Sequence, residues 1–502
     1  MAKNEIRLEY SGFVVFAVQL LSVVTGVIFQ LIIIRAISAV TPPDKVSDVY
    51  GVWSNVSKDV LPYFTLMAGV FPFWALRFTA RGTEGAVKTG VLANLTISLI
   101  SALTYTFLVP FIVSALGVGD YSFLYFIAAL QIIEIYAINI FEACIQAKKP
   151  HVIGYGLFLR ELSKVSLGYF LINIVYSGDP LTGAMLSLII AFTIQGIYYL
   201  RLLLEDLKQK FQWKYLKEWL KGSIANIYNA VGNQIAAFIF IMLFIYGGEA
   251  ARGVYGAASL IASIIGYSSY LAFALYPKLL AEGKSEDVTT AMRIVLMFAL
   301  PMTAGAIALS DSYLTILTSE FRTATPVLVV LAIDALVATI SGIYGTVLMG
   351  FEKVDEKAQI SFKELLRSRL FLAFSLPYLH SAITLPTTFY ALTTWVQNDP
   401  LQAAVSVGVI NSVARFVMFL IQYVIVRRIV RIEIPWWNIA KYVFASALMA
   451  TILFLIPHPT TIMLTFAVTA IGGIIYLLIV MVLDKEAKML ISRTLQIIQS
   501  KG

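Results

Sequence analysis

Fourteen apolar segments, each long enough to cross a membrane as a helix, dominate this chain of 502 residues. A membrane-crossing helix needs about 20 mostly apolar residues, and short polar breaks separate the segments. The pattern predicts an all-α, multi-pass protein of the cell membrane. The predicted spans are 11–37, 50–76, 89–113, 121–147, 152–176, 181–203, 222–247, 253–277, 291–310, 324–350, 370–395, 401–426, 438–456 and 461–482.

The charged residues fix the expected orientation of these spans. Only 13% of the residues are charged, whereas a soluble domain carries about 25%, which excludes an ordinary soluble enzyme. If both termini are cytoplasmic, 29 of the 37 Lys and Arg residues fall on the cytoplasmic side and three in the outer loops. This asymmetry follows the positive-inside rule. The net charge of +8 therefore reports topology, and we expect no nucleic-acid partner.

Three pairs of similar motifs recur 205 positions apart, each pair at the same place in the topology. Because six helices separate the copies, both halves share one orientation, and their pseudo-two-fold axis runs along the membrane normal. The expected organisation is an N-lobe at 1–206, a C-lobe at 207–432, two extra helices within 433–483 and a cytoplasmic tail at 484–502. The motif pairs are Val49–Gly51 with Val254–Gly256, Pro72 with Pro277, and Ala86–Lys88 with Ala291–Arg293.

The usual sequence signals of catalysis are missing. The chain has one cysteine and three widely separated histidines, so it offers no metal-ligand cluster. It contains no G-x-x-x-x-G-K-[ST] motif, which argues against ATP-driven pumping by this chain. The predicted outer loops are too short to hold a folded domain. We therefore expect neither a cofactor nor a metal, and a protein that is not an enzyme.

Polar residues within the spans point to a water-filled cavity. Such residues are costly in hydrocarbon and face protein or water. In four spans they recur at helical spacing along one face. The alternative is that they only hydrogen-bond neighbouring helices together. The candidates are Gln19 in span 1, Asn55, Lys58 and Asp59 in span 2, Asn226, Asn229 and Asn233 in span 7, and Tyr255 and Ser259 in span 8.

Other charged residues suggest ion pairs inside each lobe. In a hairpin of spans 4 and 5, Glu142 lies at about the depth of Arg160, with Lys164 one turn further along. Asp334 in span 10 and Arg415 in span 12 form a second candidate pair. A different interpretation is that Glu134, Asp334 or Asp59 binds a coupling proton or cation. The sequence leaves both open.

The order of landmarks resembles a known family. The stretch 222–282 holds a helix with a polar face, then Ala251–Ala258, then Leu275–Leu280. Phe141–Lys149 and Leu300–Gly305 add further matches. Together they resemble the polysaccharide and lipid-linked oligosaccharide flippases of the multidrug/oligosaccharidyl-lipid/polysaccharide exporter superfamily, across nearly the whole chain.

The resemblance implies two six-helix lobes around a hydrophilic cavity lined by helices 1, 2, 7 and 8, and transport by alternating access. The implied substrate is an oligosaccharide linked through phosphate or pyrophosphate to a polyprenyl lipid. Related cavities are cationic, and the counterparts here would be Lys58, Arg35 and Arg252. Arg35 and Arg252 are expected near the outer mouth, and Asp59 is expected to offset part of the charge of Lys58. Expected partners are the lipid-linked glycan, membrane lipids, and glycosyltransferases or other proteins of glycan assembly.

Two other functions compete with this one. A cation-coupled exporter of small organic molecules, from the same superfamily, usually has twelve helices rather than fourteen. A membrane-embedded enzyme or subunit of glycan assembly typically carries a large outer loop, which the predicted topology lacks.

Overall fold

The computed structural model describes residues 21–22, 24–149, 151–272, 285–350 and 369–484. The regular secondary structure of these residues is helical, and none of them forms a β-strand. They divide into two compact units, one ending at Gly253 and the other beginning at Val254. The all-helical prediction is confirmed. The predicted limits of the lobes, the extra helices and the tail stay predictions.

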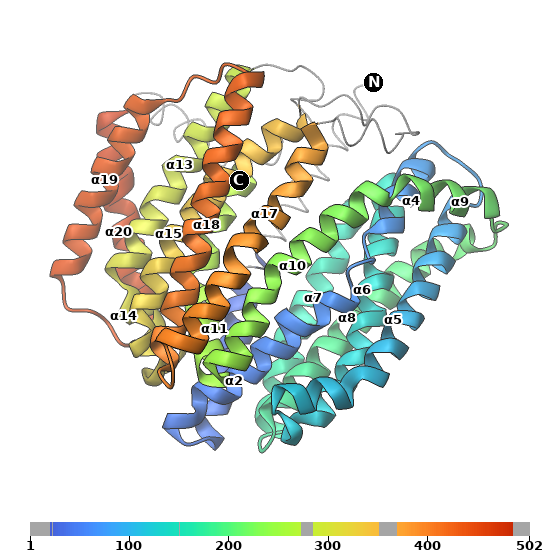
Figure 1. Cartoon of the computed structure of the whole chain (residues 1–502), viewed down its shortest axis with the longest axis horizontal. Coiled ribbons are helices and arrows are strands. Elements are labelled where there is room, and N and C mark those ends of the chain that lie inside the picture. The colour runs from blue at the N-terminus through green and yellow to red at the C-terminus, as the bar shows by residue number, and fades with distance from the viewer. Residues whose placement is uncertain (1–20, 23, 150, 273–284, 351–368, 485–502) are drawn as a thin grey trace, which may run out of the picture. The chain divides into compact units, whose positions relative to one another are not determined.

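The first unit is built around four long helices that pack α5 on α6, α6 on α8 and α7 on α8, as Figure 1 shows. Its first described helix is Val24–Val40. The others are η1 (Pro43–Lys45), α2 (Val46–Ser54), η2 (Asn55–Val60), α3 (Leu61–Phe64), α4 (Val70–Ala80), α5 (Ala86–Leu116), η3 (Gly119–Tyr121), α6 (Ser122–Lys148), α7 (His151–Phe170), η4 (Leu171–Val175), α8 (Pro180–Leu207), α9 (Trp213–Gly222) and α10 (Ile224–Gly247).

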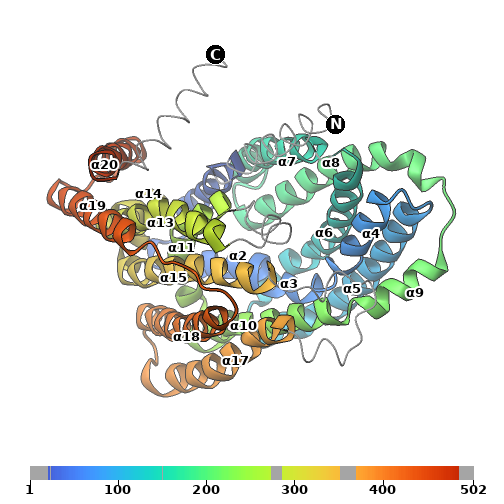
Figure 2. The same ribbon diagram turned by 90° about the horizontal axis from the view of Figure 1, so that it is seen from above.

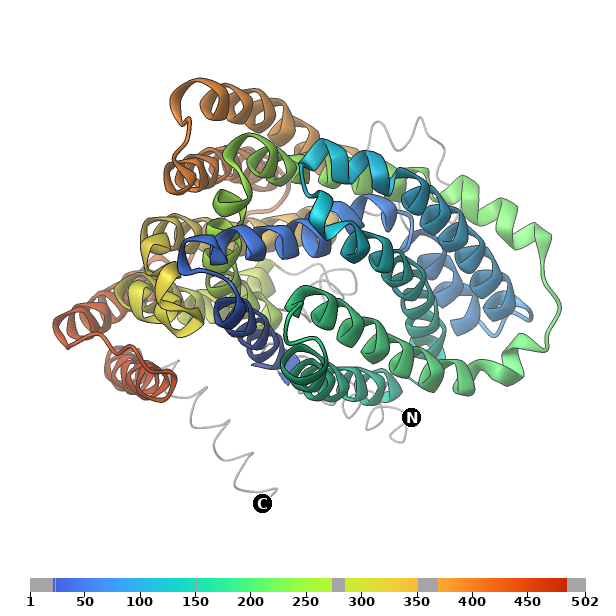
Figure 3. The same ribbon diagram turned by 90° about the horizontal axis from the view of Figure 1, so that it is seen from below.

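The second unit packs α13 on α15 and α15 on α18, and adds α19 and α20 beside α13. Figure 2 shows α19 next to α20, and Figure 3 shows α17 and α18, in orange, as a hairpin. Its elements are α11 (Glu249–Gly266, which begins in the first unit), η5 (Tyr267–Ala272), α13 (Ser285–Ala308), α14 (Ser310–Leu317), η6 (Ser319–Ala324), α15 (Thr325–Gly350), α17 (Arg369–Tyr390), η8 (Ala391–Trp395), α18 (Pro400–Ile429), α19 (Trp436–Leu455) and α20 (Ile462–Leu483).

Side-chain hydrogen bonds join the last helix, α20, to the rest of the second unit. The hydroxyl of Tyr476 in α20 donates to the carbonyl of Met297 in α13, at 2.6 Å. The hydroxyls of Tyr313 in α14 and Thr469 in α20 lie 2.8 Å apart. Because buried hydroxyls need partners, these bonds fix the position of α20 against the unit.

The two units share a structural motif that the sequence analysis missed. In each unit a π-helical segment, η4 or η8, is followed by an Asp-Pro pair that starts a long helix. Asp179 caps α8 by accepting from the Thr182 N–H at 3.2 Å, and Asp399 caps α18 by accepting from the Gln402 N–H at 3.0 Å. Proline suits the first helical position because its missing N–H has no intrahelical partner there. These copies lie 220 positions apart rather than 205, so the second half has 15 more residues than the first between the earlier markers and this one.

Nine helices among the described residues are long and apolar enough to cross a membrane. They coincide with nine of the fourteen predicted spans, which confirms a multi-pass membrane protein. The count of fourteen and the cytoplasmic termini stay predictions. The nine are Ala86–Leu116, Gly119–Lys148, Pro180–Leu207, Asn226–Gly247, Ser285–Ala308, Ser319–Leu348, Pro400–Ile429, Trp436–Leu455 and Ile462–Leu483.

The structure adds local detail that apolar runs alone do not reveal. Predicted span 2 is not one continuous helix: it is α-helical, then π-helical at 55–60, and is interrupted again between Phe64 and Val70. The connection expected after residue 203 contains α9, and the loop expected after residue 310 contains α14. Helix α9 packs Trp219 into the core of the first unit. Its alternation of lysines with aromatic residues was the available signal.

Candidate functional site

The candidate site begins at a break in helix geometry within predicted span 2. In an α-helix the ring of Pro62 would clash with the carbonyl of Lys58, four residues earlier. The π-helical segment Asn55–Val60 directly precedes this proline and widens the turn. It therefore carries Asn55, Lys58 and Asp59 on one irregular stretch of backbone.

A close crossing of two helices brings a distant arginine to this stretch. A Cβ placed on Gly51 of α2 would lie 2.0 Å from the Glu249 carbonyl oxygen. A Cβ placed on Gly253 of α11 would lie 1.8 Å from the Ser47 carbonyl oxygen. Only glycine permits such an approach of two backbones, as in the small-residue contacts of membrane helices. The crossing sets Arg252, next to Gly253, beside α2.

Arg252 and Asp59 form a bidentate ion pair in the first unit. The guanidinium Nε donates to Oδ2 of Asp59 at 2.6 Å, and Nη2 donates to Oδ1 at 2.8 Å. The two side chains are only 4% and 1% exposed. The ring of Phe240 in α10 lies 5.5 Å from the guanidinium carbon. Two parallel charge-assisted bonds are the geometry that compensates a buried arginine and carboxylate for lost hydration.

Lys58 differs from this pair because its side chain is exposed. It lies within electrostatic range of both Arg252 and Asp59. The sequence predicted that Asp59 would offset part of the charge of Lys58. In the structure both carboxylate oxygens of Asp59 bond to Arg252, so Asp59 mainly balances the charge of Arg252. The cluster of two cations and one anion keeps one positive charge, on an accessible side chain.

Helix α10 lies next to this cluster and presents amide side chains. The Tyr63 hydroxyl in α3 donates to the Gln234 carbonyl at 3.1 Å, which ties α3 to α10. The Asn233 side chain is exposed and donates to the Asn229 carbonyl at 3.0 Å. Asn226 is half-buried one turn before Asn229. The exposed lysine and these amides therefore belong to the same unit.

The remaining cavity candidates are placed differently. Asn55 is fully buried and its Oδ1 accepts from the Tyr125 hydroxyl at 2.7 Å, so this amide joins α6 to η2. Arg35 is exposed. Tyr255 is buried in the second unit, where Ser259 donates to the Gly256 carbonyl at 2.9 Å. Gln19 lies outside the described residues.

The predicted ion pairs are formed only in part. Arg415 donates through Nε to Oδ1 of Asp334 at 2.8 Å, so the structure brings these two together. Arg160 lies within electrostatic range of Glu142, but among the described residues the two form no direct ion pair. Glu142 Oε1 accepts from the side-chain amide of Gln195 at 3.0 Å and from the Tyr199 hydroxyl at 3.3 Å.

Arg160 and Lys164 instead surround Glu161, a buried residue of α7 that is 1% exposed. It accepts from Arg160 Nη2 at 3.0 Å, from Lys164 Nζ, and from the Thr25 hydroxyl at 2.5 Å. The signal available in the sequence was its position beside Arg160 and three residues before Lys164. Glu134 in α6 is half-buried and accepts from Thr193 of α8 at 2.7 Å. No cation among the described residues pairs with it.

A group of acidic residues borders the helix crossing outside the predicted spans. Burial raises the pKa of the Glu249 carboxyl above its ordinary value, and the neighbouring carboxylates of Asp48 and Asp120 raise it further. Burial also raises the pKa of Asp48, while Lys45 lowers it. Within the described part of the chain, no group of three or more His, Cys, Asp or Glu residues could hold a metal ion.

No family model and no curated protein matches this sequence. Solved structures do match in fold. The lipid II flippase MurJ, in an inward closed conformation, aligns with a TM-score of 0.67 at 13% identity, covering 94% of this chain and 99% of that one. An inward-facing multidrug resistance MATE family transporter of the MOP superfamily aligns with a TM-score of 0.59 at 14% identity, covering 80% and 94%. A MATE protein in complex with MaL6 gives 0.54 at 15% identity, covering 84% and 96%. The expected resemblance is confirmed at the level of the fold.

Proposed function

We propose that this chain, which has the fold of MOP-superfamily transporters, is a membrane transporter for a lipid-linked oligosaccharide. It would carry the polar headgroup, joined to a polyprenyl lipid through phosphate or pyrophosphate, from the cytoplasmic to the outer leaflet by alternating access. The observation that carries the proposal is the cluster of Lys58, Asp59 and Arg252. It leaves one accessible positive charge within predicted span 2, beside the amide groups of α10.

The chemistry of the headgroup fits this cluster. A phosphate group and many hydroxyls cannot cross hydrocarbon unaided, because each unpaired polar group costs several kcal/mol there. Lys58 supplies an ammonium for the phosphate, and Asn229 and Asn233 supply amides for hydroxyl groups. Outward movement of an anion is also favoured by an inside-negative potential, by roughly 2.3 kcal/mol per charge per 100 mV.

The extent of the structural likeness favours a flippase over a small-molecule exporter. The lipid II flippase covers 94% of this chain, whereas the first MATE transporter covers 80%. Helices α19 and α20 lie beyond the two predicted six-helix repeats, and an exporter of twelve helices would have no counterpart for them. Export of small organic molecules is the second candidate function, favoured by the TM-score of 0.59 with that MATE transporter.

Ion coupling, if the cycle uses it, is assigned to Glu134 rather than to Asp334. A coupling carboxyl must exchange a proton or cation during the cycle. Arg415 holds Asp334 in an ion pair, whereas Glu134 has Thr193 as its described hydrogen-bond partner. Association with glycosyltransferases or other glycan-assembly proteins stays a prediction from the resemblance.

The test is reconstitution of the full chain into vesicles with two substrates measured side by side. One is a fluorescent oligosaccharide on polyprenyl pyrophosphate, scored by its accessibility at each leaflet, and the other is an organic cation, scored by efflux. The proposal expects transbilayer movement of the glycolipid without cation efflux. Cation efflux without glycolipid movement would instead establish the exporter function.

A further inference from the structure

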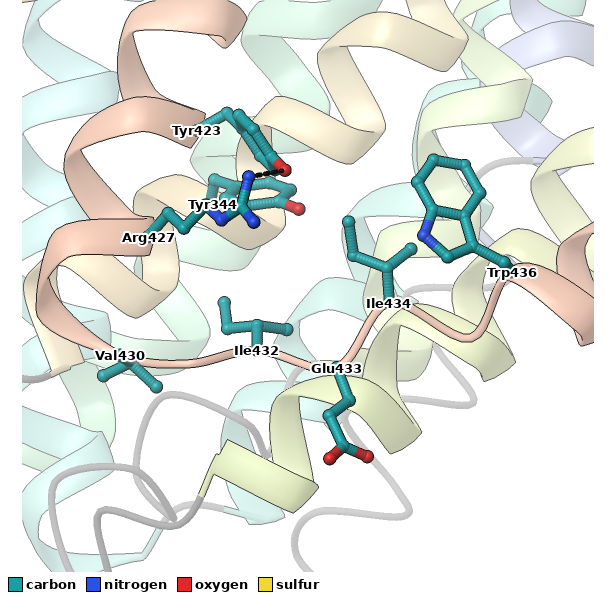
Figure 4. A pocket seen from close by; sticks show the side chains of 8 residues that line it. All are labelled: Tyr344, Tyr423, Arg427, Val430, Ile432, Glu433, Ile434 and Trp436. Carbon is teal, nitrogen blue, oxygen red and sulfur yellow. Dashed lines mark hydrogen bonds between the residues drawn. The ribbon is translucent and has the colours of Figure 1, made fainter.

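A pocket of about 320 Å³ lies in the second unit, and none of the residues predicted from the sequence to line the transport cavity is among its lining residues. It forms where α18 ends and a short linker leads to α19, with α15 behind it (Figure 4). The backbone carbonyl of Glu433 in this linker accepts a hydrogen bond from the Thr289 hydroxyl of α13 at 2.8 Å, which holds the linker against α13. The lining residues are Tyr344, Tyr423, Arg427, Val430, Ile432, Glu433, Ile434 and Trp436.

The polar groups around the pocket are mainly hydrogen-bond donors. The Arg427 guanidinium donates to the Tyr423 hydroxyl at 3.3 Å, and no carboxylate of the described residues forms an ion pair with it. A guanidinium has five N–H donors, so most remain for a ligand. Tyr344 adds a hydroxyl and Trp436 an indole N–H. Figure 4 shows the Glu433 carboxylate pointing away from Arg427. This donor set suits an anion with several acceptor oxygens.

The other wall of the pocket is apolar, and the setting is the membrane boundary. Val430, Ile432 and Ile434 contribute aliphatic side chains. The pocket joins the ends of two candidate membrane spans, Pro400–Ile429 and Trp436–Leu455. Trp436 is 70% exposed, as expected for an aromatic residue at the interface between membrane and water. A ligand here meets a cationic donor on one side and hydrocarbon on the other.

The volume limits what fits. About 320 Å³ is at the small end of the range for ligand pockets, which suits a phosphodiester with a small alcohol, while acyl chains would stay in the bilayer. The side of the membrane is the one rich in Lys and Arg, which the positive-inside rule assigns to the cytoplasm, where anionic lipids attract basic segments.

We propose that this pocket binds the phosphate-bearing headgroup of an anionic phospholipid, with Arg427 as the anion contact and Tyr344, Tyr423 and Trp436 as walls. The shared chemistry is a phosphate ester. The adjoining membrane spans and the aliphatic wall favour a lipid over free phosphate as its source. The site shares no residue with the proposed glycolipid cavity and does not depend on the proposed function.

The test compares full-length variants in nanodiscs of phosphatidylcholine with a minor fraction of phosphatidylglycerol, measuring retained phosphatidylglycerol by native mass spectrometry. Arg427→Gln removes the pocket cation. Arg428→Gln and Arg431→Gln remove neighbouring exposed cations that do not line the pocket. The proposal expects about a tenfold loss of phosphatidylglycerol for Arg427→Gln and less than a twofold change for both controls. Equal losses in all three variants, or none, would overturn it.

Two further experiments test the role of the Tyr344 hydroxyl and distinguish a lipid from a soluble phosphate. Tyr344→Phe keeps the ring and removes the hydroxyl, so it is expected to lower retention about threefold, and it decides the matter if Arg427→Gln fails to fold. Competition with inorganic phosphate and glycerol phosphate identifies the source. The proposal expects no displacement by these soluble ions at millimolar concentration, and complete displacement would refute the assignment to a lipid.

Discussion

Two aspartate–arginine pairs among the described residues differ in how far their side chains are exposed to water. Asp59 and Arg252, in the first unit, share two hydrogen bonds and are 1% and 4% exposed. Asp334 and Arg415, in the second unit, share one, and their side chains are 11% and 36% exposed. The first pair requires a close crossing of two helices, whereas the second joins helices that pack along much of their length.

The two pairs therefore contribute differently to the fold. A dry pair gains little net stability over apolar residues, but losing one partner leaves an uncompensated charge. A partly hydrated pair contributes little, because water replaces the missing partner. The Asp59–Arg252 pair therefore acts mainly to fix where α11 meets α2, and so where Lys58 points.

The largest loss of stability is expected when one partner of the Asp59–Arg252 pair is removed. Arg252→Met leaves the Asp59 carboxylate buried without its partner and should lower the free energy of unfolding by about 3–5 kcal/mol. The double variant Asp59→Leu with Arg252→Met should recover most of that loss. Reversible denaturation in detergent measures both. A double variant as unstable as the single one would show that the pair itself, rather than the orphaned charge, holds the fold.

The helix crossing gives the next largest effect. Gly253→Ala places a methyl group 1.8 Å from the Ser47 carbonyl oxygen, so the two backbones must separate, at a cost of about 1–3 kcal/mol. Gly266→Ala in the same helix is the matched control, because nothing lies within 4 Å of its added Cβ. Thermal unfolding of the two variants checks this. Equal melting temperatures would mean that the crossing is looser than the structure has it.

The hydrated pair should respond more weakly. Arg415→Gln keeps a donor near Asp334, and water reaches the site, so the loss should be about 1 kcal/mol or less. The same denaturation assay measures it. A loss as large as that of Arg252→Met would remove the distinction between the two pairs.

The smallest change in stability is expected from the ionisation of Glu249, beside the crossing of α2 and α11. The pKa of the Glu249 carboxyl is raised in the folded protein, so its ionisation destabilises the fold above its ordinary pKa and this penalty disappears as the pH falls. Glu249→Gln should therefore be slightly more stable than the parent at pH 7.5, by less than about 1 kcal/mol, and equal to it near pH 4. Melting curves at the two pH values decide. A variant that is less stable at pH 7.5 would reverse the sign.

The spans were predictable because apolar length alone specifies a membrane helix. The Asp334–Arg415 contact could also be predicted from the sequence, since the two residues lie on helices of one predicted lobe. The Asp59–Arg252 pair was not. Its partners are 193 positions apart, and their contact depends on a glycine crossing that sequence spacing does not reveal.

Irregular helix geometry was also hidden from a search for apolar runs. The π-helical turn at 55–60 follows from Pro62, four residues after Lys58, which is a readable signal. The Asp-Pro caps at Asp179 and Asp399 were a better repeat marker than the apolar motifs, because a cap and a proline have a defined structural role.

We infer that Asp59 neutralises Arg252 and leaves Lys58 as the accessible cation for a phosphate-bearing headgroup. The most direct measurement is the initial rate of glycolipid movement in vesicles for Lys58→Gln, Lys58→Arg and the exposed control Lys214→Gln. Loss of one charge-assisted hydrogen bond of about 1.5–3 kcal/mol predicts a rate roughly tenfold to a hundredfold lower for Lys58→Gln, with Lys58→Arg and Lys214→Gln near the parent. An unchanged rate for Lys58→Gln would contradict the claim.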